Sequence, residues 1–179
     1  MIWYCLNYKS QIDFMKTLII IRHAKSSWAN IGQDDKERPL NERGKKDAPE
    51  MAKRLKDRDL KIDLFASSPA KRAKRTANYF AEEFNTKKDD ILIIDELYGA
   101  GVQNFYNVIH SLKDKYNTVA LFSHNPGITE FVNTLTNEHI DNMPTCAVFA
   151  VNIHTDKWAS IKDSSTAFLF FDYPKNKQD

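Results

Sequence analysis

Residues 17–23 read Thr-Leu-Ile-Ile-Ile-Arg-His, an unbroken apolar run that stops at two polar side chains. An apolar run without polar alternation is typical of a strand that is buried on both faces of a sheet. Similar runs predict further strands at 62–66, 91–94 and 118–122, with helical patterns between them. Because strands that alternate with helices form parallel sheets covered on both faces, we expect an α/β fold.

The helices are predicted from their apolar faces and from their start signals. One face of the first helix is apolar, at Ala48, Met51, Ala52 and Leu55. Pro49 lies within this pattern, so we expect the helix to kink or restart there. Ser68 and Pro69 predict the start of the next helix, with Ser68 as its cap and Pro69 at its first position. Two further helices are predicted at 104–112 and 126–135.

The C-terminal part has a different pattern, with predicted strands at 147–153, 158–161 and 167–171 separated by turns. Consecutive strands can add an antiparallel edge, which would make the sheet mixed. We therefore expect residues 15–179 to form one three-layer α/β/α sandwich with a mostly parallel, mixed central sheet. Met15 stands directly before the first strand, so we expect translation to begin there and residues 1–14 to be a non-native or disordered extension.

Composition excludes several classes of protein. The 179 residues include 26 Lys and Arg against 24 Asp and Glu, and this balance argues against a general nucleic-acid binder. The two cysteines, Cys5 and Cys146, form neither a zinc pattern nor a disulfide framework. No apolar run approaches the roughly 20 residues that span a bilayer, and residues 1–14 lack the features of a signal peptide. We expect a cytoplasmic protein, without membrane or nucleic-acid partners, that is a monomer.

Two histidines and two arginines follow the predicted strands. Arg22 and His23 come directly after the first strand, Arg72 is in the helix after the second, and His124 follows the fourth. The carboxyl ends of parallel strands meet at one edge of the sheet, where ligands bind in such folds. Arginine suits phosphate oxygens, and a neutral histidine can attack phosphorus. The pattern predicts a phosphoryl-transfer site that takes its positive charge from the protein and needs neither metal nor cofactor.

Four segments in order, at 17–26, 38–44, 67–77 and 123–128, resemble the motifs of the histidine phosphatase superfamily. Within that superfamily, the chain resembles the SixA-type phosphohistidine phosphatases over roughly 16–171. The resemblance implies a phosphoglycerate-mutase-like fold and a covalent phosphohistidine intermediate. It implies that His23 is the nucleophile, that Arg22 and Arg72 bind the phosphate, and that His124 completes the phosphate cage.

Other positions are assigned by their place in these segments. Lys25 and Ser26 follow the nucleophile and are predicted to bind substrate. The wider superfamily implies a carboxylic acid after the third strand, where this chain has Asp95 and Glu96. The SixA type implies instead that no dedicated acid is needed, because solvent can protonate an imidazole leaving group.

The predicted function is hydrolysis of protein phosphohistidine through phospho-His23. The partner would be a phosphorylated protein, such as a histidine-phosphotransfer domain, because the sequence predicts an open site without large insertions. Two alternatives stay open: a phosphatase for small phosphate esters, and a non-catalytic module that binds phosphoproteins. The loop at 26–37 could fold over the site. Lys74 and Arg75, which share a helix with Arg72, are read as a solvated helix face. The alternative is that Lys71 and Lys74 help to dock an acidic protein.

Overall fold

The computed structural model describes residues 14–29 and 32–176. The predicted extension at 1–14 and Cys5 lie outside the described residues, except for Phe14, which is exposed. No helix within the described part is both long and apolar enough to cross a membrane.

Six strands form one mixed sheet in the part of the chain that the structure describes. They are β1 (Lys16–Arg22), β2 (Leu64–Ser67), β3 (Leu92–Ile93), β4 (Thr118–Ser123), β5 (Val148–Ile153) and β6 (Thr166–Asp172). The order across the sheet is β3-β2-β4-β1-β5-β6. The first four strands pair in parallel, and β5 and β6 add the expected antiparallel edge.

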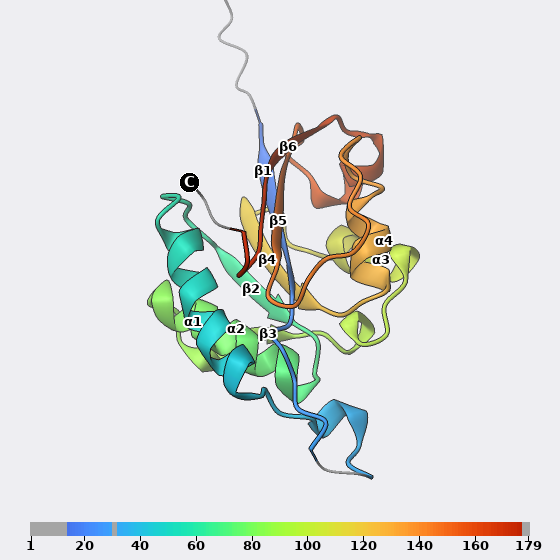
Figure 1. Cartoon of the computed structure of the whole chain (residues 1–179). Coiled ribbons are helices and arrows are strands. Elements are labelled where there is room, and N and C mark those ends of the chain that lie inside the picture. Colours follow the sequence, from blue (N-terminus) through green and yellow to red (C-terminus); the bar gives the residue numbers. More distant parts are fainter. Residues whose placement is uncertain (1–13, 30–31, 177–179) are drawn as a thin grey trace, which may run out of the picture.

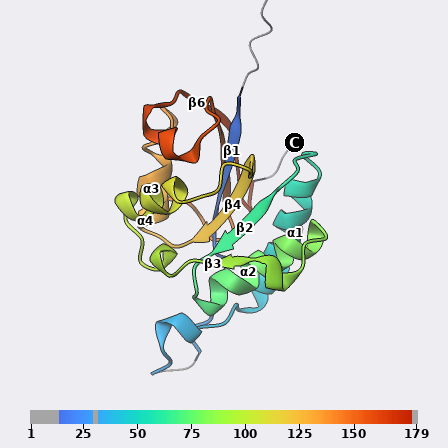
Figure 2. The ribbon, with the colours of Figure 1, turned by 180° about the vertical axis from the view of Figure 1, so that it is seen from behind.

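Helices cover both faces of this sheet (Figure 1, Figure 2). The α-helices are α1 (Glu42–Lys56), α2 (Lys71–Glu83), α3 (Val102–His110) and α4 (Gly127–Val132). Short 3-10 helices are η1 (Asp35–Glu37), η2 (Lys88–Asp90), η3 (Asp95–Leu97) and η4 (Trp158–Asp163). One face carries α1 and α2, and the other carries α3, α4 and η4. The predicted three-layer α/β/α sandwich is confirmed.

The apolar run of β1 serves both layers of the core. Ile19 and Ile21 pack in the cluster on the α1 and α2 side, whereas Leu18 and Ile20 pack in the cluster under α3 and α4. All four side chains are fully buried. Because successive side chains of a strand point to opposite faces, a strand between two helical layers needs apolar residues at every position.

Of the two outcomes predicted at Pro49, a kink or a restart, the restart is wrong, since the helix runs unbroken from Glu42 to Lys56. Asn41 caps its start, and the Asn41 side chain accepts a hydrogen bond of 2.9 Å from the Gly44 N–H. Proline removes one backbone donor from a helix. The apolar face continues past Pro49 through Met51 and Leu55, and its burial keeps the two halves in one helix.

The predicted start of α2 at Ser68 and Pro69 is also wrong. The helix begins at Lys71 with Ala70 in the cap position, and no side chain caps it. The Ser68 hydroxyl instead shares a hydrogen bond of 2.7 Å with His124 Nε2. Ser68 Oγ also accepts a hydrogen bond of 3.2 Å from the Ala70 N–H before the helix, so the hydroxyl group takes part in a local turn and in a tertiary contact.

The strand predicted at 158–161 is a 3-10 helix, η4. Trp158 is fully buried, and its indole N–H donates a hydrogen bond of 2.9 Å to the Tyr116 carbonyl. The Trp158 backbone N–H donates to the Asp114 carboxylate, also at 2.9 Å. These bonds hold the segment against the loop before β4, so its apolar residues fill the core from a helical turn.

Candidate active site

The two histidines lie side by side because their strands are neighbours. Arg22 is the last residue of β1 and pairs in register with Ser123, the last residue of β4. His23 and His124 are the next residues along each strand, and their ring centroids are 4.9 Å apart. Arg72, the second residue of α2, reaches the same edge, where its Nε donates a hydrogen bond of 3.2 Å to His23 Nε2. The structure thus brings together the four residues that the sequence predicted.

His23 is held in one tautomer. Its Nδ1 lies 2.8 Å from the Ala24 carbonyl oxygen, which can only accept, so Nδ1 carries the proton and Nε2 carries the lone pair. Burial, chiefly, and then the charges of neighbouring groups hold the pKa of His23 well below its usual value. The imidazole is therefore neutral near pH 7, with Nε2 available as a nucleophile or acceptor.

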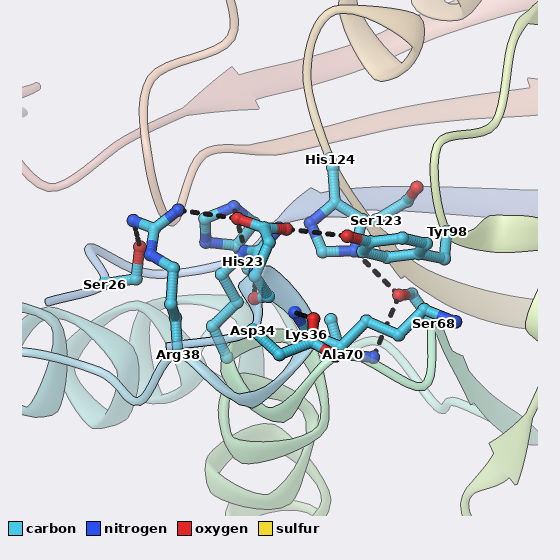
Figure 3. Close-up of polar contacts among 12 residues, drawn as sticks. His23, Ser26, Asp34, Lys36, Arg38, Ser68, Ala70, Tyr98, Ser123 and His124 are labelled. Carbon is cyan, nitrogen blue, oxygen red and sulfur yellow. Dashed lines mark hydrogen bonds and ion pairs between the residues drawn. The ribbon is translucent and has the colours of Figure 1, made fainter. Parts of the chain in front are cut away.

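His124 is also buried and neutral. Burial and then the nearby Arg72 guanidinium lower the pKa of His124 to about 3. The Tyr98 ring packs against it edge to face, with centroids 5.5 Å apart, and Ser68 bonds to its Nε2 (Figure 3). The other ring nitrogen, Nδ1, is buried and has no hydrogen-bond partner within the described residues.

Arg22 presents a second nitrogen of this kind. One terminal nitrogen of its guanidinium donates a hydrogen bond of 2.6 Å to the Met143 carbonyl. Its Nε is buried without a partner in the part of the chain that the structure describes. The positive charge of Arg22 contributes to lowering the pKa of both His23 and His124.

Asp35, which belongs to none of the motifs, is brought to the site from the loop after β1. Its carboxylate accepts hydrogen bonds of 2.8 Å from Arg72, 2.8 Å from Arg38 and 2.7 Å from the Tyr98 hydroxyl. Partial burial raises the pKa of Asp35, but the bonds from Tyr98, Arg38 and Arg72 outweigh it and leave the pKa well below its usual value. The sequence held one signal that could have identified Asp35 as a site residue. Asp35 stands three residues before Arg38, in a loop that leaves the sheet at this edge.

The two predicted substrate-binding residues are held by loop contacts. Ser26 Oγ accepts a hydrogen bond of 2.7 Å from Arg38. The backbone of Ser26 also pairs with that of Leu40 in an isolated antiparallel β-bridge. The carbonyl of Lys25 accepts a hydrogen bond of 3.0 Å from the Asn41 N–H at the start of α1. Close packing at this point requires Gly44, because a Cβ there would lie 2.2 Å from the Lys25 carbonyl oxygen. These contacts tie the segment after His23 to the first turn of α1.

The two acid candidates lie apart from this cluster. Asp95 and Glu96 are exposed in η3, and no hydrogen bond or ion pair among the described residues joins either one to His23 or His124. Tyr98, two residues further along the chain, does reach the cluster through Asp35. Among the described residues, no group of acidic, histidine and cysteine side chains is arranged to hold a metal ion.

Comparison with known proteins and the geometry of the site both indicate a histidine phosphatase. Residues 18–99 match the model of the histidine phosphatase superfamily (branch 1). A solved structure assigned as phosphohistidine phosphatase SixA from Agrobacterium tumefaciens is 26% identical, with a TM-score of 0.72, and the match covers 87% of this chain and 96% of that one. A protein histidine phosphatase SixA complexed with tungstate has the same fold, with a TM-score of 0.75 and 22% identity over 89% of this chain and 98% of that one. Residues 18–99 thus match the histidine phosphatase superfamily, and the chain is similar to the SixA type within it.

Two curated relatives match this chain over only part of their own length. Phosphoserine phosphatase 1 of Hydrogenobacter thermophilus is 36% identical over 107 residues, which is 57% of this chain and 47% of that protein. An uncharacterized chloroplastic protein of Arabidopsis thaliana is 27% identical over 80% of this chain and 69% of its own length. The chain thus spans about half the length of the phosphoserine phosphatase. The family and the SixA neighbours support phosphatase activity.

Proposed function

We propose that this protein hydrolyses protein phosphohistidine by taking the phosphoryl group onto His23 Nε2 and then transferring it to water. The observation that carries the proposal is a pair of buried, unpartnered nitrogens, Arg22 Nε and His124 Nδ1, on the two residues that flank the neutral His23 ring. Buried donors without partners are costly in a folded protein, and phosphoryl oxygens would satisfy them.

His23 would act as the nucleophile. The Ala24 carbonyl fixes the proton on Nδ1, so the lone pair is on Nε2, which faces the Arg72 guanidinium. The bond from Arg72 Nε to His23 Nε2 keeps a positive charge beside the nitrogen that would carry the phosphoryl group. Arg72 would move its hydrogen bond from Nε2 to a phosphoryl oxygen as the new bond forms.

His124 would act as a neutral hydrogen-bond donor. Ser68 Oγ accepts a hydrogen bond from the Ala70 N–H, so its own proton is free to be donated to His124 Nε2. A neutral imidazole that accepts at Nε2 carries its proton on Nδ1. That proton would then be donated to a phosphoryl oxygen, and Arg22 and Arg72 would neutralise the remaining charge without a metal ion.

The reaction would take place in two displacements. In the first, the lone pair of His23 Nε2 forms a bond to phosphorus, the phosphorus–nitrogen bond of the substrate breaks, and the electron pair returns to the substrate imidazole. In the second, water attacks phosphorus, the bond to Nε2 breaks with its electron pair returning to Nε2, and the proton of water leaves with phosphate or solvent. His23 is regenerated as the neutral imidazole.

The acid–base groups favour phosphohistidine over a phosphate ester. An alcohol leaving group needs a proton from an acid at the site, whereas an imidazole is protonated by solvent near neutral pH. The carboxylate beside Arg72 is Asp35, whose low pKa leaves it ionised and without a proton to give. Asp95 and Glu96, the predicted acids, are exposed and make no contact with the histidines in the described structure.

The test is a single-turnover assay with a phosphohistidine-bearing protein and with phosphoserine as the ester substrate. We expect the parent protein to release phosphate from phosphohistidine and to form an acid-labile phosphoenzyme. His23→Ala should abolish both signals, and His110→Ala, which removes a histidine from α3, should leave them unchanged. Faster turnover of phosphoserine would favour the ester phosphatase, and binding without any phosphoenzyme would favour the binding module.

A further inference from the structure

A groove beside the candidate site is lined by positively charged side chains. It has a volume of about 500 Å³ and lies between α2 and the segment that leads through η2 into β3. Its cationic residues are Lys71, Lys74, Arg75 and Lys88, and Asp89 is the acidic residue in its lining. All four cations are exposed to solvent. The whole chain carries a formal charge of only +2, so this excess is a property of this face.

Three of these charges have no acidic partner. Lys71 lies 3.9 Å from the Glu37 carboxylate, but Lys74, Arg75 and Lys88 form no ion pair with any described residue. Exposed ammonium and guanidinium groups of this kind can bind carboxylates of another molecule without first breaking an internal pair.

The groove and the candidate active site share helix α2. Lys71, Lys74 and Arg75 are spaced so that they share the outer face of α2. Arg72, between them in sequence, points inward and bonds to His23. A molecule bound along this outer face would therefore lie one residue away from the guanidinium that is proposed to bind phosphate.

The neighbouring edge of the sheet is apolar and exposed. The two residues of β3, Leu92 and Ile93, are 46% and 44% exposed, and β3 pairs only with β2 among the described strands (Figure 2). Ile93 lines the basic groove, and both residues line a second hollow of about 380 Å³ toward Tyr116. Exposed apolar side chains on an unpaired sheet edge are typical of surfaces that another chain covers.

We infer that this surface, formed by α2, η2 and β3, docks an acidic segment of the phosphoprotein substrate; the inference rests on the proposed function. Carboxylates of the segment would pair with Lys74, Arg75 and Lys88, and an apolar side chain would cover Leu92 and Ile93. A nucleic acid would also match the charges, but it would leave the two apolar residues exposed. Basic side chains beside exposed apolar side chains therefore favour a protein partner. A protein bound on this surface would lie against α2, the helix that carries Arg72, so that its phosphohistidine could reach His23.

The experiment compares two phosphohistidine peptides that are identical except that glutamates in one are glutamines in the other. Turnover is measured for both peptides and for phosphoramidate, and binding of the unphosphorylated peptides is measured separately by fluorescence anisotropy. The test variant is Lys74→Gln/Arg75→Gln. Its matched control is Lys46→Gln/Lys53→Gln, which removes two exposed charges from α1 that do not line the groove.

We expect the parent protein to bind the glutamate peptide about three- to tenfold more tightly than the glutamine peptide, with the preference decreasing as salt is added. The test variant should lose this preference through KM, with kcat for the peptide and turnover of phosphoramidate unchanged. The control variant should keep it. Equal binding of the two peptides by the parent, or equal losses in both variants, would overturn the docking surface. Preferential binding without phosphohistidine turnover would support the surface and reject the proposed substrate.

Discussion

Arg72 and Asp35 are joined by two hydrogen bonds, one from Arg72 to the Asp35 carboxylate at 2.8 Å and one to the Asp35 carbonyl. The same guanidinium donates through its Nε to the His23 imidazole. The carboxylate and the backbone carbonyl of Asp35 thus each accept from one terminal nitrogen of the arginine that is predicted to bind phosphate. Asp35 belongs to the loop at 26–37, which was expected from the sequence to fold over the site, and this contact brings that part of the loop to the site.

Asp35 is expected to compete with bound oxyanions. Asp35→Asn removes the negative charge beside Arg72, so the Kd for tungstate should decrease about tenfold, which corresponds to about 1.4 kcal/mol. Isothermal titration calorimetry measures this constant directly. Asp34→Asn is the control, because the Asp34 side chain caps η1 through the Lys36 N–H and does not touch Arg72. Weaker binding by Asp35→Asn would show that the carboxylate positions Arg72 instead of competing for it.

The Ser68 hydroxyl is expected to set the tautomer of His124. Ser68→Ala removes the bond to His124 Nε2 and frees the proton to move from Nδ1, so kcat should fall about three- to tenfold with little change in KM. Steady-state kinetics with the phosphohistidine protein separates the two constants. Ser67→Ala is the control, because Ser67 is equally buried but donates to the Ser68 carbonyl. Equal kinetic effects in both variants would mean that lost packing, and not the tautomer, is responsible.

Stability should decrease in mild acid because His124 is buried in its neutral form. Its pKa of about 3 lies below the ordinary value, so between about pH 6.5 and 3 the unfolded chain binds a proton that the folded chain does not. The free energy of unfolding should therefore decrease as pH falls below 6.5, by up to about 1.4 kcal/mol per pH unit for this group. His23, with a pKa shifted in the same direction, adds to the slope.

Urea denaturation at pH 7.5, 6.0 and 5.0 checks this slope. His124→Asn removes one titrating group, and its free energy of unfolding should depend less steeply on pH than that of the parent. The carboxylate of Asp35 contributes only at lower pH, since its ordinary pKa is already below this range. Identical slopes for parent and variant would contradict a buried neutral His124.

Gly127 is expected to be required for packing at the start of α4. A Cβ at this position would lie 1.7 Å from the Ala100 carbonyl oxygen, so Gly127→Ala should lower the free energy of unfolding by about 3 kcal/mol. Gly101→Ala is the control, because the nearest atom to its Cβ would be 3.8 Å away. Thermal and urea denaturation measure both. Similar losses in the two variants would show that backbone freedom, and not close packing, is the reason for glycine at 127.

Turnover is expected to be independent of divalent metal ions, since Arg22 and Arg72 would supply the positive charge for phosphoryl transfer. Dialysis against EDTA should leave kcat and KM for the phosphohistidine protein unchanged. Addition of Mg²⁺ or Zn²⁺ to the dialysed protein serves as the comparison. Loss of activity on dialysis that either ion restores would reject the proposed mechanism.

Some features could be predicted because they depend on local pattern. Five consecutive residues, 17–21, are apolar or β-branched, and this pattern indicates a strand buried on both faces wherever it occurs. The positions of His23, Arg72 and His124 after predicted parallel strands then place them at one edge of the sheet. Local pattern also misled, since Ser68-Pro69 is a helix-start signal and Trp158 to Ile161 has a strand-like composition.

The sequence by itself determined the α/β class, the antiparallel edge and the four residues that meet at the end of the sheet, because strand periodicity and the parallel rule act without knowledge of distant contacts. Only the tertiary structure decided that Asp35 bonds to Arg72 across 37 residues, and that Ser68 bonds to His124 across 56. Such hydrogen bonds depend on where loops pack in three dimensions. No periodicity or cap signal encodes that packing, so the partner of each polar side chain became known only from the fold.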